Sequence, residues 1–194
     1  MQRILWLILF SIVLLFDAYL EGYYLLIYYT IWTFILETLF FLCLVLEKYT
    51  PRLVSWRKQL FEIIFAPSIV VCVGFWLVIA PRYIHHSKPR NGVLIAVTHG
   101  LNAVAMLTEV RGLPHASVWK PVLYTIIYNV FLMLYVGAGG RSMSGNLPYW
   151  YAQYNRPMGW IFAFVSVTAV AAVHVTSSLY IWPVKPKSST QYIV

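Results

Sequence analysis

The chain has 194 residues, of which 61% are hydrophobic, 18% are aromatic and only 10% are charged, and its formal net charge is +8. Soluble globular proteins contain about 25% charged residues, so this chain has too few polar groups to cover a water-soluble domain. The mean hydropathy of +0.73 agrees with that exclusion. We therefore predict an all-α polytopic membrane protein in which residues 1–194 form a single transmembrane domain.

Six segments have the length that a membrane-spanning helix needs, which is about 20 mostly apolar residues. They are expected at residues 3–20, 24–46, 59–80, 93–110, 119–137 and 158–182, with glycine or proline in every connection between them. The first segment lacks a small-residue cleavage site, since Asp17 and Tyr19 follow its apolar run. We expect a retained helix there rather than a cleaved signal peptide.

An even number of spans places both termini on the same side of the membrane. Basic residues in short loops favour the cytoplasmic or matrix side. Nine lie on the terminal side and five on the other side: Arg3, Lys48, Arg52, Arg57, Lys58, Arg111, Lys120, Lys185 and Lys187 against Arg82, Lys88, Arg90, Arg141 and Arg156. We predict that both termini face the cytoplasm or the matrix.

The positive charge does not indicate a nucleic-acid partner, because the basic residues are scattered over loops instead of gathered on one face. Cys43 and Cys72 lie inside apolar segments and behave as small hydrophobic residues. His85 and His86 have no further ligand nearby, so we expect no metal site and no cofactor.

Polar side chains inside the spans are the candidate functional residues, because such groups are costly in lipid. Thr30 and His99 each lie about six residues from the same side of the membrane, roughly 9 Å below its boundary, and are expected at one level. Deeper positions near the midplane form a candidate supporting polar network: Glu37, Asn102, Asn129 and His174. The alternative is interhelical packing through hydrogen bonds, and for Thr30 a bond to its own helix backbone.

The connection from Gly137 to Pro157 is the longest and is rich in glycine, serine and aromatic residues. Tyr149, Tyr151 and Tyr154 suit an aromatic belt at the membrane interface, or a cap over a cavity that opens there. Both interpretations stay open at this point.

Three stretches carry a resemblance to a known family: Thr30 within YYTIWTFILETLFF, Pro67 followed by Phe75 and Trp76, and His99 within VTHGLNAVAMLTE. Over roughly residues 24–182 the chain resembles the family of androgen-induced proteins and androgen-dependent TFPI-regulating proteins. It is similar also to the rolling-stone proteins, which share the HGLN-like stretch.

The resemblance implies a six-span hydrolase that cleaves lipid esters of hydroxy fatty acids, with Thr30 as nucleophile and His99 as base. Asn102 and Trp32 are candidates to stabilise the oxyanion, and Glu37 and Asn102 are candidates to orient the imidazole. Membrane lipids are then the partners, and an endomembrane or the plasma membrane is the location.

A second interpretation comes from departures from the hydrolases. Shortly after the catalytic histidine, the hydrolases often have a second histidine, whereas this chain has Asn102, which makes it more similar to the rolling-stone group. Its loops are also short. These features fit a non-catalytic lipid-binding or structural accessory subunit of a larger membrane complex, with the mitochondrial inner membrane as the alternative location. The sequence lacks the charge ladders and paired broken helices of channels and transporters.

Overall fold

The computed structural model describes residues 2–83, 92–110 and 117–180, and these ranges are almost entirely helical, with no strand. In chain order the elements are α1 (Gln2–Glu21), the 3-10 helix η1 (Gly22–Ile27), α2 (Tyr29–Leu46), α3 (Leu53–Gly74), the π-helical segment η2 (Phe75–Ile79), α4 (Ala80–Tyr83), α5 (Gly92–Ala96), the π-helical segment η4 (Val97–Leu101), α6 (Asn102–Thr108), α7 (Trp119–Gly137) and α8 (Pro157–Tyr180). The predicted all-α fold class is confirmed.

Five helical runs in the described ranges are long and apolar enough to cross a bilayer. They are Gln2–Ile27, Tyr29–Leu46, Leu53–Ile79, Trp119–Gly137 and Pro157–Leu179. The segment expected at 93–110 is a shorter apolar helix, Leu94–Thr108, which contains η4. The chain is thus a membrane-embedded α-helical protein with several spans.

Several helix boundaries differ from the predicted ones, and α3 begins at Leu53 rather than at residue 59. Gly22 has φ +59°, a left-handed conformation that ends α1 and turns the chain into η1. As a result α2 begins at Tyr29 rather than at residue 24. The third predicted segment was expected to end at residue 80, but α3 continues through η2 and α4 to Tyr83.

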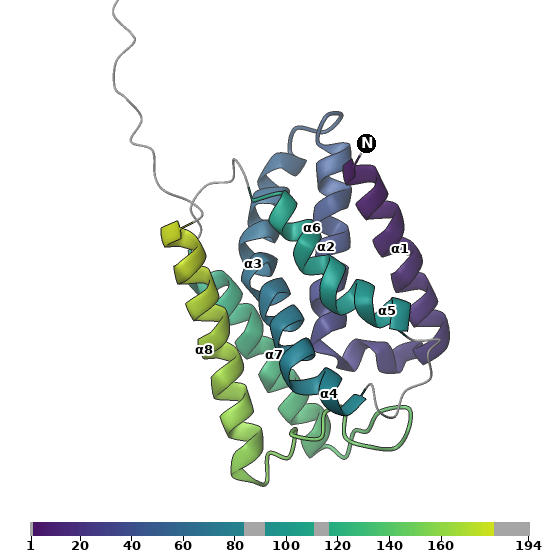
Figure 1. Ribbon diagram of the computed structural model, residues 1–194, viewed down its shortest axis with the longest axis vertical. Helices are drawn as coiled ribbons and strands as arrows, with labels where there is room; N and C mark the ends of the chain where they lie inside the picture. Colours follow the sequence, from purple (N-terminus) through teal and green to yellow (C-terminus); the bar gives the residue numbers. More distant parts are fainter. Residues whose placement is uncertain (1, 84–91, 111–116, 181–194) are drawn as a thin grey trace, which may run out of the picture.

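The helices form one bundle in which α3 is central (Figure 1). α1 packs on α2, α2 packs on α3, and α3 also contacts α6, α7 and α8. Phenylalanine rings fill the interface between α1 and α2: Phe10 lies 4.6 Å from Phe34 and 5.6 Å from Phe41 between ring centroids. All three side chains are fully buried, and in lipid such close van der Waals packing, rather than the hydrophobic effect, holds the two helices together.

The bundle has two distinct ends. The beginning of α1, the end of α6 and the end of α8 lie at the upper end in Figure 1, which we call the terminal end. η1, α4 and the connection 138–156 lie at the opposite end, the loop end.

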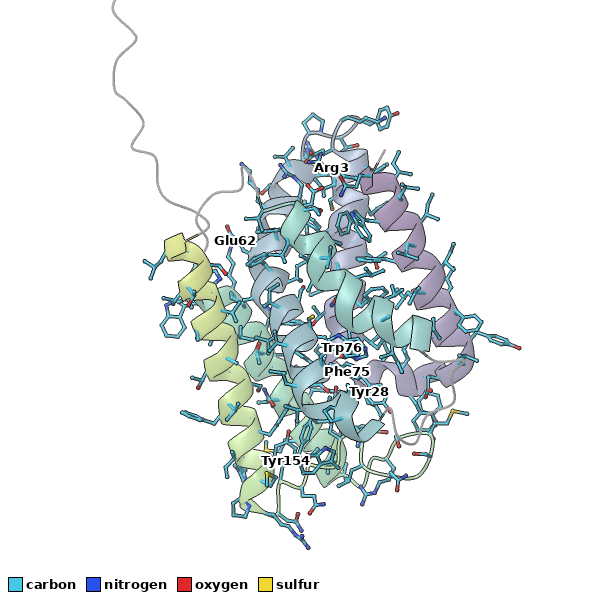
Figure 2. All side chains as sticks on the ribbon, viewed as in Figure 1. Arg3, Tyr28, Glu62, Phe75, Trp76 and Tyr154 are labelled. Carbon is cyan, nitrogen blue, oxygen red and sulfur yellow. The ribbon has the colours of Figure 1, made fainter. Side chains whose placement is uncertain are left out.

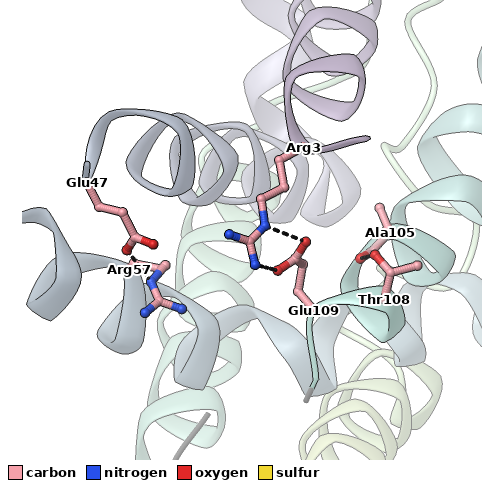
Figure 3. A network of polar contacts seen from close by, with 6 residues as sticks. All are labelled: Arg3, Glu47, Arg57, Ala105, Thr108 and Glu109. Atoms are coloured by element: carbon pink, nitrogen blue, oxygen red, sulfur yellow. Dashed lines mark hydrogen bonds and ion pairs between the residues drawn. The ribbon is translucent and has the colours of Figure 1, made fainter. Parts of the chain in front are cut away.

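Among the described residues three ion pairs join helices, and Figure 3 shows two of them, which lie at the terminal end. Arg3 makes a two-point contact with Glu109, with nitrogen–oxygen distances of 3.1 and 2.9 Å, and so connects α1 to the end of α6. Arg57 lies 2.6 Å from Glu47 across the connection between α2 and α3. The third pair, Lys120 with Glu62, connects α7 to α3.

The outer surface of the bundle is apolar along its length. Leu15, Leu134 and Phe164 are 71%, 63% and 73% exposed, and they come from three different helices. Large contiguous apolar surfaces of this kind are a liability in water but are the normal outer face of a protein in lipid.

Candidate active site

Thr30 and His99 lie side by side near the loop end of the bundle. Thr30 is in the first turn of α2 and His99 is in η4, and Thr30 Oγ1 is 3.2 Å from His99 Nε2. Both side chains are half-buried. The structure therefore brings together the two residues that were expected at one depth.

The hydrogen bonds of the His99 ring determine which nitrogen carries the proton. Nδ1 lies 2.8 Å from Thr98 Oγ1 and 3.2 Å from the carbonyl oxygen of Ile95. The carbonyl can only accept, and the Thr98 hydroxyl already donates to the carbonyl of Leu94, so both partners of Nδ1 are acceptors. Nδ1 therefore carries the proton in the neutral ring, and Nε2 presents its lone pair to the Thr30 hydroxyl. A general base needs this tautomer.

Two π-helical segments meet at His99. The indole Nε1 of Trp76, in η2, donates to the main-chain carbonyl of His99 at 3.1 Å, and the Phe75 ring lies over the imidazole with a centroid distance of 3.8 Å. Figure 2 labels Phe75 and Trp76. In η4 itself the N–H of Asn102 bonds to Val97, five residues back. π-Helical turns inside α-helices are rare and frequently occur at functional sites.

The N-terminal turn of α2 leaves a hydrogen-bond donor beside the Thr30 hydroxyl. The N–H groups of Ile31 and Trp32 bond to the Tyr28 carbonyl, and that of Tyr29 bonds to a tyrosine hydroxyl. Among the described residues, no acceptor takes the N–H of Thr30 itself. The first turn of a helix also carries partial positive charge, so this N–H suits a developing oxyanion.

A cavity of about 320 Å³ adjoins the pair. Thr30 and His99 are part of its wall, and the rest is contributed mainly by α3, η2, α7, α8 and the connection 138–156. The lining is overwhelmingly apolar. A hydroxyl and an imidazole at the edge of an apolar cavity suit a ligand with an alkyl chain.

Two tyrosines of the 138–156 connection close the cavity at the loop end. The Tyr149 hydroxyl accepts a hydrogen bond from the N–H of Tyr29 at 3.0 Å, and Tyr151 stacks on Phe162 with a centroid distance of 3.7 Å. Tyr149 and Tyr151 line the cavity, whereas Trp150 between them is 46% exposed. For these two tyrosines the geometry fits a cap over the cavity.

Tyr154 lies outside the cap, at the loop end of the bundle (Figure 2). Its carbonyl oxygen accepts a hydrogen bond from Trp160 Nε1 at 3.0 Å, which joins the loop to the start of α8. Burial, with a smaller contribution from Tyr149, raises the pKa of the Tyr154 hydroxyl to about 12, so this group stays neutral at physiological pH.

Glu37 and Asn102 come together in the interior, away from His99. Glu37 is fully buried, and its Oε1 shares the single hydroxyl proton of Ser68 with the Ile64 carbonyl, which lies 2.7 Å from Ser68 Oγ. The Asn102 amide lies beside the Glu37 carboxyl without meeting hydrogen-bond geometry. These two residues therefore do not orient the imidazole.

The other two residues of the predicted network lie on α7 and α8. Asn129 Nδ2 donates to the Thr125 carbonyl at 2.9 Å and to the Ser166 hydroxyl at 3.1 Å, and Asn129 also lines the cavity. His174 is buried on α8. The structure thus divides Glu37 and Asn129 between separate sets of partners, because each helix turns a different stripe toward its own neighbour.

The two side-chain donors proposed for the oxyanion have other neighbours. Trp32 Nε1 donates to the Leu26 carbonyl at 2.7 Å, and the Asn102 amide lies beside Glu37. The side-chain contact to His99 Nδ1 comes from Thr98, which the sequence reasoning missed. The only hint in the sequence was its position directly before His99.

Within the described ranges, no group of three or more His, Cys, Asp or Glu side chains forms a metal-binding cluster. His85 and His86 lie outside the described residues. Comparisons with protein-family models, with curated proteins and with solved structures gave no match.

Proposed function

We propose that this protein is an intramembrane hydrolase of lipid esters, with Thr30 as nucleophile and His99 as general base. One observation carries the proposal: Thr30 Oγ1 lies 3.2 Å from His99 Nε2, on the wall of an apolar cavity. A threonine hydroxyl is unreactive alone and requires an adjacent base, which the tautomer of His99 supplies.

In the first half-reaction, the Thr30 hydroxyl oxygen attacks the ester carbonyl while its proton passes to His99 Nε2. The negative charge on the carbonyl oxygen is stabilised by the free N–H of Thr30 at the N-terminus of α2. The tetrahedral intermediate then expels the alcohol, which takes the proton from Nε2. An acyl group remains bonded to Thr30 Oγ1.

In the second half-reaction, water attacks the acyl carbon and gives a proton to Nε2. The bond between the acyl carbon and Thr30 Oγ1 breaks, and the Thr30 oxygen recovers the proton from Nε2. The products are a fatty acid and the free enzyme. Throughout both steps Thr98 and the Ile95 carbonyl hold the protonated Nδ1, which keeps the ring in its orientation.

The substrate class we propose is the ester of a hydroxy fatty acid, on the resemblance to the androgen-induced-protein family. The apolar lining of the cavity supports an amphiphilic ester of this kind. Membrane lipids are then both surroundings and substrate, and the proposed location is an endomembrane or the plasma membrane.

We propose six spans with both termini on the cytoplasmic or matrix side. In addition to the five long helical runs, we count as a span the run from α5 through η4 to α6, Gly92–Thr108, which is the fourth in chain order. At about 1.5 Å per residue this run is a little shorter than a typical hydrocarbon core. Support comes from the start of α1 and the end of α8, which lie at the same end of the bundle (Figure 1).

The topology can be tested with single cysteines introduced at Ser55 or at Ser144, in a protein whose Cys43 and Cys72 have been replaced. Each variant is treated with a membrane-impermeant thiol reagent in intact and in opened vesicles. Labelling of both positions from one side would contradict it.

Labelling with a fluorescent fluorophosphonate probe tests the chemistry. The protein is extracted gently from its membrane and labelled, and then resolved on a native gel as wild type, Thr30→Ala, His99→Ala and Thr38→Ala. Thr38 is the matched control, since it lies on the same helix and its hydroxyl bonds only to the Phe34 carbonyl of its own helix. We expect labelling of wild type and Thr38→Ala and at least about a hundredfold loss in the other two.

The same gel decides about the second function, a non-catalytic accessory subunit of a larger membrane complex. The apolar outer surface of the bundle can be covered by neighbouring proteins as well as by lipid. An unlabelled band within a large assembly would support that function, with the mitochondrial inner membrane as a location to examine, and would reject the hydrolase.

A further inference from the structure

The cavity beside Thr30 has one buried wall and one exposed rim. Val71 and Tyr128 on the wall are 7% and 3% exposed. Val73 and Leu77 on the rim are 49% and 72% exposed, and Val165 opposite them is 53% exposed. The cavity therefore opens on the side of the bundle, between the end of α3 with η2 and the middle of α8.

Small residues contribute to the lining on both sides of the opening. On the α3–η2 side the lining includes positions 70, 73 and 74 of α3 and 77 of η2, with Gly74 among them. On α8 the lining positions 162, 165, 166, 169 and 173 follow helical spacing and include Ser166 and Ala169. A Cβ atom at Gly74 would have nothing within 4 Å, so the space beside this position is empty.

The surroundings of the opening define what can enter it. The rim belongs to Leu53–Ile79 and Pro157–Leu179, two helical runs that are long and apolar enough to span a membrane. At this depth the molecules that reach the opening are lipids and their acyl chains. A volume of about 320 Å³ is at the lower limit of ligand pockets, roughly 300–1,000 Å³, and suits one chain rather than two.

We infer that this cavity binds a single acyl chain of a lipid ester, which enters sideways from the bilayer between α3–η2 and α8, and that Gly74 and Ala169 determine the chain length accepted. The ester group of the bound chain then lies at Thr30 and His99. This inference rests on the proposed function for the bond that reacts, whereas chain binding itself can be tested separately.

Binding is tested with Thr30→Ala protein in phosphatidylcholine nanodiscs, so that turnover does not interfere. The probe is a hexadecanoyl ester with a photoreactive diazirine at mid-chain, and cross-linked residues are mapped by mass spectrometry. Val104 faces outward and is 48% exposed, so bulk lipid should cross-link to it in any case. If the chain enters the cavity, we expect additional cross-links on Val71 and Tyr128, which are buried and which bulk lipid does not reach. Cross-links restricted to outward-facing residues would overturn the inference.

Chain selection is tested with Gly74→Leu against Gly137→Leu. Gly137 is a helical glycine whose Cβ would also meet nothing within 4 Å, but it does not line the cavity, so it is the matched control. In Gly74→Leu we expect cross-linking of Tyr128 to fall about tenfold, because a few methylene groups in an apolar pocket are worth that much. Ala169→Phe fills the cavity from the opposite wall and gives the same result if Gly74→Leu fails to fold.

The outcomes separate the inference from the proposed function. Loss of cross-linking in both cavity variants but not in the control supports the chain site, even if no variant hydrolyses an ester. Equal cross-linking in wild type, Gly74→Leu and Ala169→Phe overturns it. If hydrolysis is present, the ratio of hexadecanoyl to butanoyl ester turnover should fall about tenfold in Gly74→Leu, and an unchanged ratio counts against chain selection.

Discussion

The indole Nε1 of Trp76 donates a hydrogen bond to the main-chain carbonyl of His99 at 3.1 Å, which ties the π-helical segment η2 to the π-helical segment η4. The same segment η2 supplies Phe75, whose ring lies over the imidazole. The position of the proposed base therefore depends on a contact between two helices.

Replacing Trp76 by phenylalanine removes this hydrogen bond and keeps an aromatic side chain. We expect a loss of about 1 kcal/mol of stability, the usual net value of one hydrogen bond, and about a tenfold loss of probe labelling as His99 shifts relative to Thr30. Thermal unfolding in detergent and the labelling rate measure the two effects. Trp160→Phe is the control, because the Trp160 indole donates in the same way but to the Tyr154 carbonyl, far from the pair. Equal labelling in both variants would contradict the role of Trp76.

Replacing Thr98 by valine removes one of the two acceptors that hold the proton on His99 Nδ1. The Ile95 carbonyl still accepts from Nδ1, so the correct tautomer becomes less favoured but is not lost. We expect kcat to fall about tenfold, part of the roughly 100- to 10,000-fold that a general base supplies, with KM unchanged.

Thr98→Ser separates this positioning role from packing. Serine keeps the hydroxyl and loses a methyl group from a buried site, so it should restore most of kcat while lowering stability. Full activity in Thr98→Val would show that the hydroxyl has no part in positioning the imidazole.

Glu37 is expected to act in packing and not in catalysis. Ser68 Oγ contacts both Glu37 Oε1 and the Ile64 carbonyl, and a glutamine can keep the contact at residue 37, so Glu37→Gln should keep labelling and stability within about 1 kcal/mol. Glu37→Ala leaves Ser68 without this partner and opens a space in the core, at a cost of about 2–4 kcal/mol. Chemical or thermal unfolding, with labelling of the folded fraction, distinguishes the two variants. A large loss of labelling in well-folded Glu37→Gln would give this carboxyl a catalytic role.

Gly159→Ala should loosen the tyrosine cap over the cavity. An alanine Cβ there would lie 2.9 Å from the main-chain carbon and oxygen of Gln153, and main chain cannot move aside as a flexible side chain can. We expect a loss of about 1–3 kcal/mol, as for overpacking in general, and weaker stacking of Tyr151 on Phe162.

Gly137→Ala is the comparison for that variant, since its Cβ would meet nothing. Alanine in a helix is favoured over glycine by about 0.5–1 kcal/mol, so the melting temperature should stay the same or rise. A melting temperature lowered equally by both substitutions would contradict the proposed clash at Gly159.

Much of this protein could be predicted from the sequence, because hydropathy is a property of consecutive residues. The composition alone excludes a water-soluble domain, and the segment at 119–137 has the bounds that the structure gives to α7. The common level expected for Thr30 and His99 came from the distance of each residue to the end of its segment, but α2 begins at Tyr29, so Thr30 lies in the first turn of its helix rather than six residues inside it.

The tertiary structure decides what hydropathy averages over, namely how each helix is rotated about its axis and which helix it faces. Those rotations join Glu37 to Ser68, place Asn129 beside Ser166, and bring Gly74 and Ala169 into the wall of one cavity. The tautomer of His99 is decided in the same way, through the hydroxyl of Thr98. A shift of a few tenths of an ångström makes or breaks such contacts between segments far apart in the chain, and only the packed bundle determines their positions to that precision.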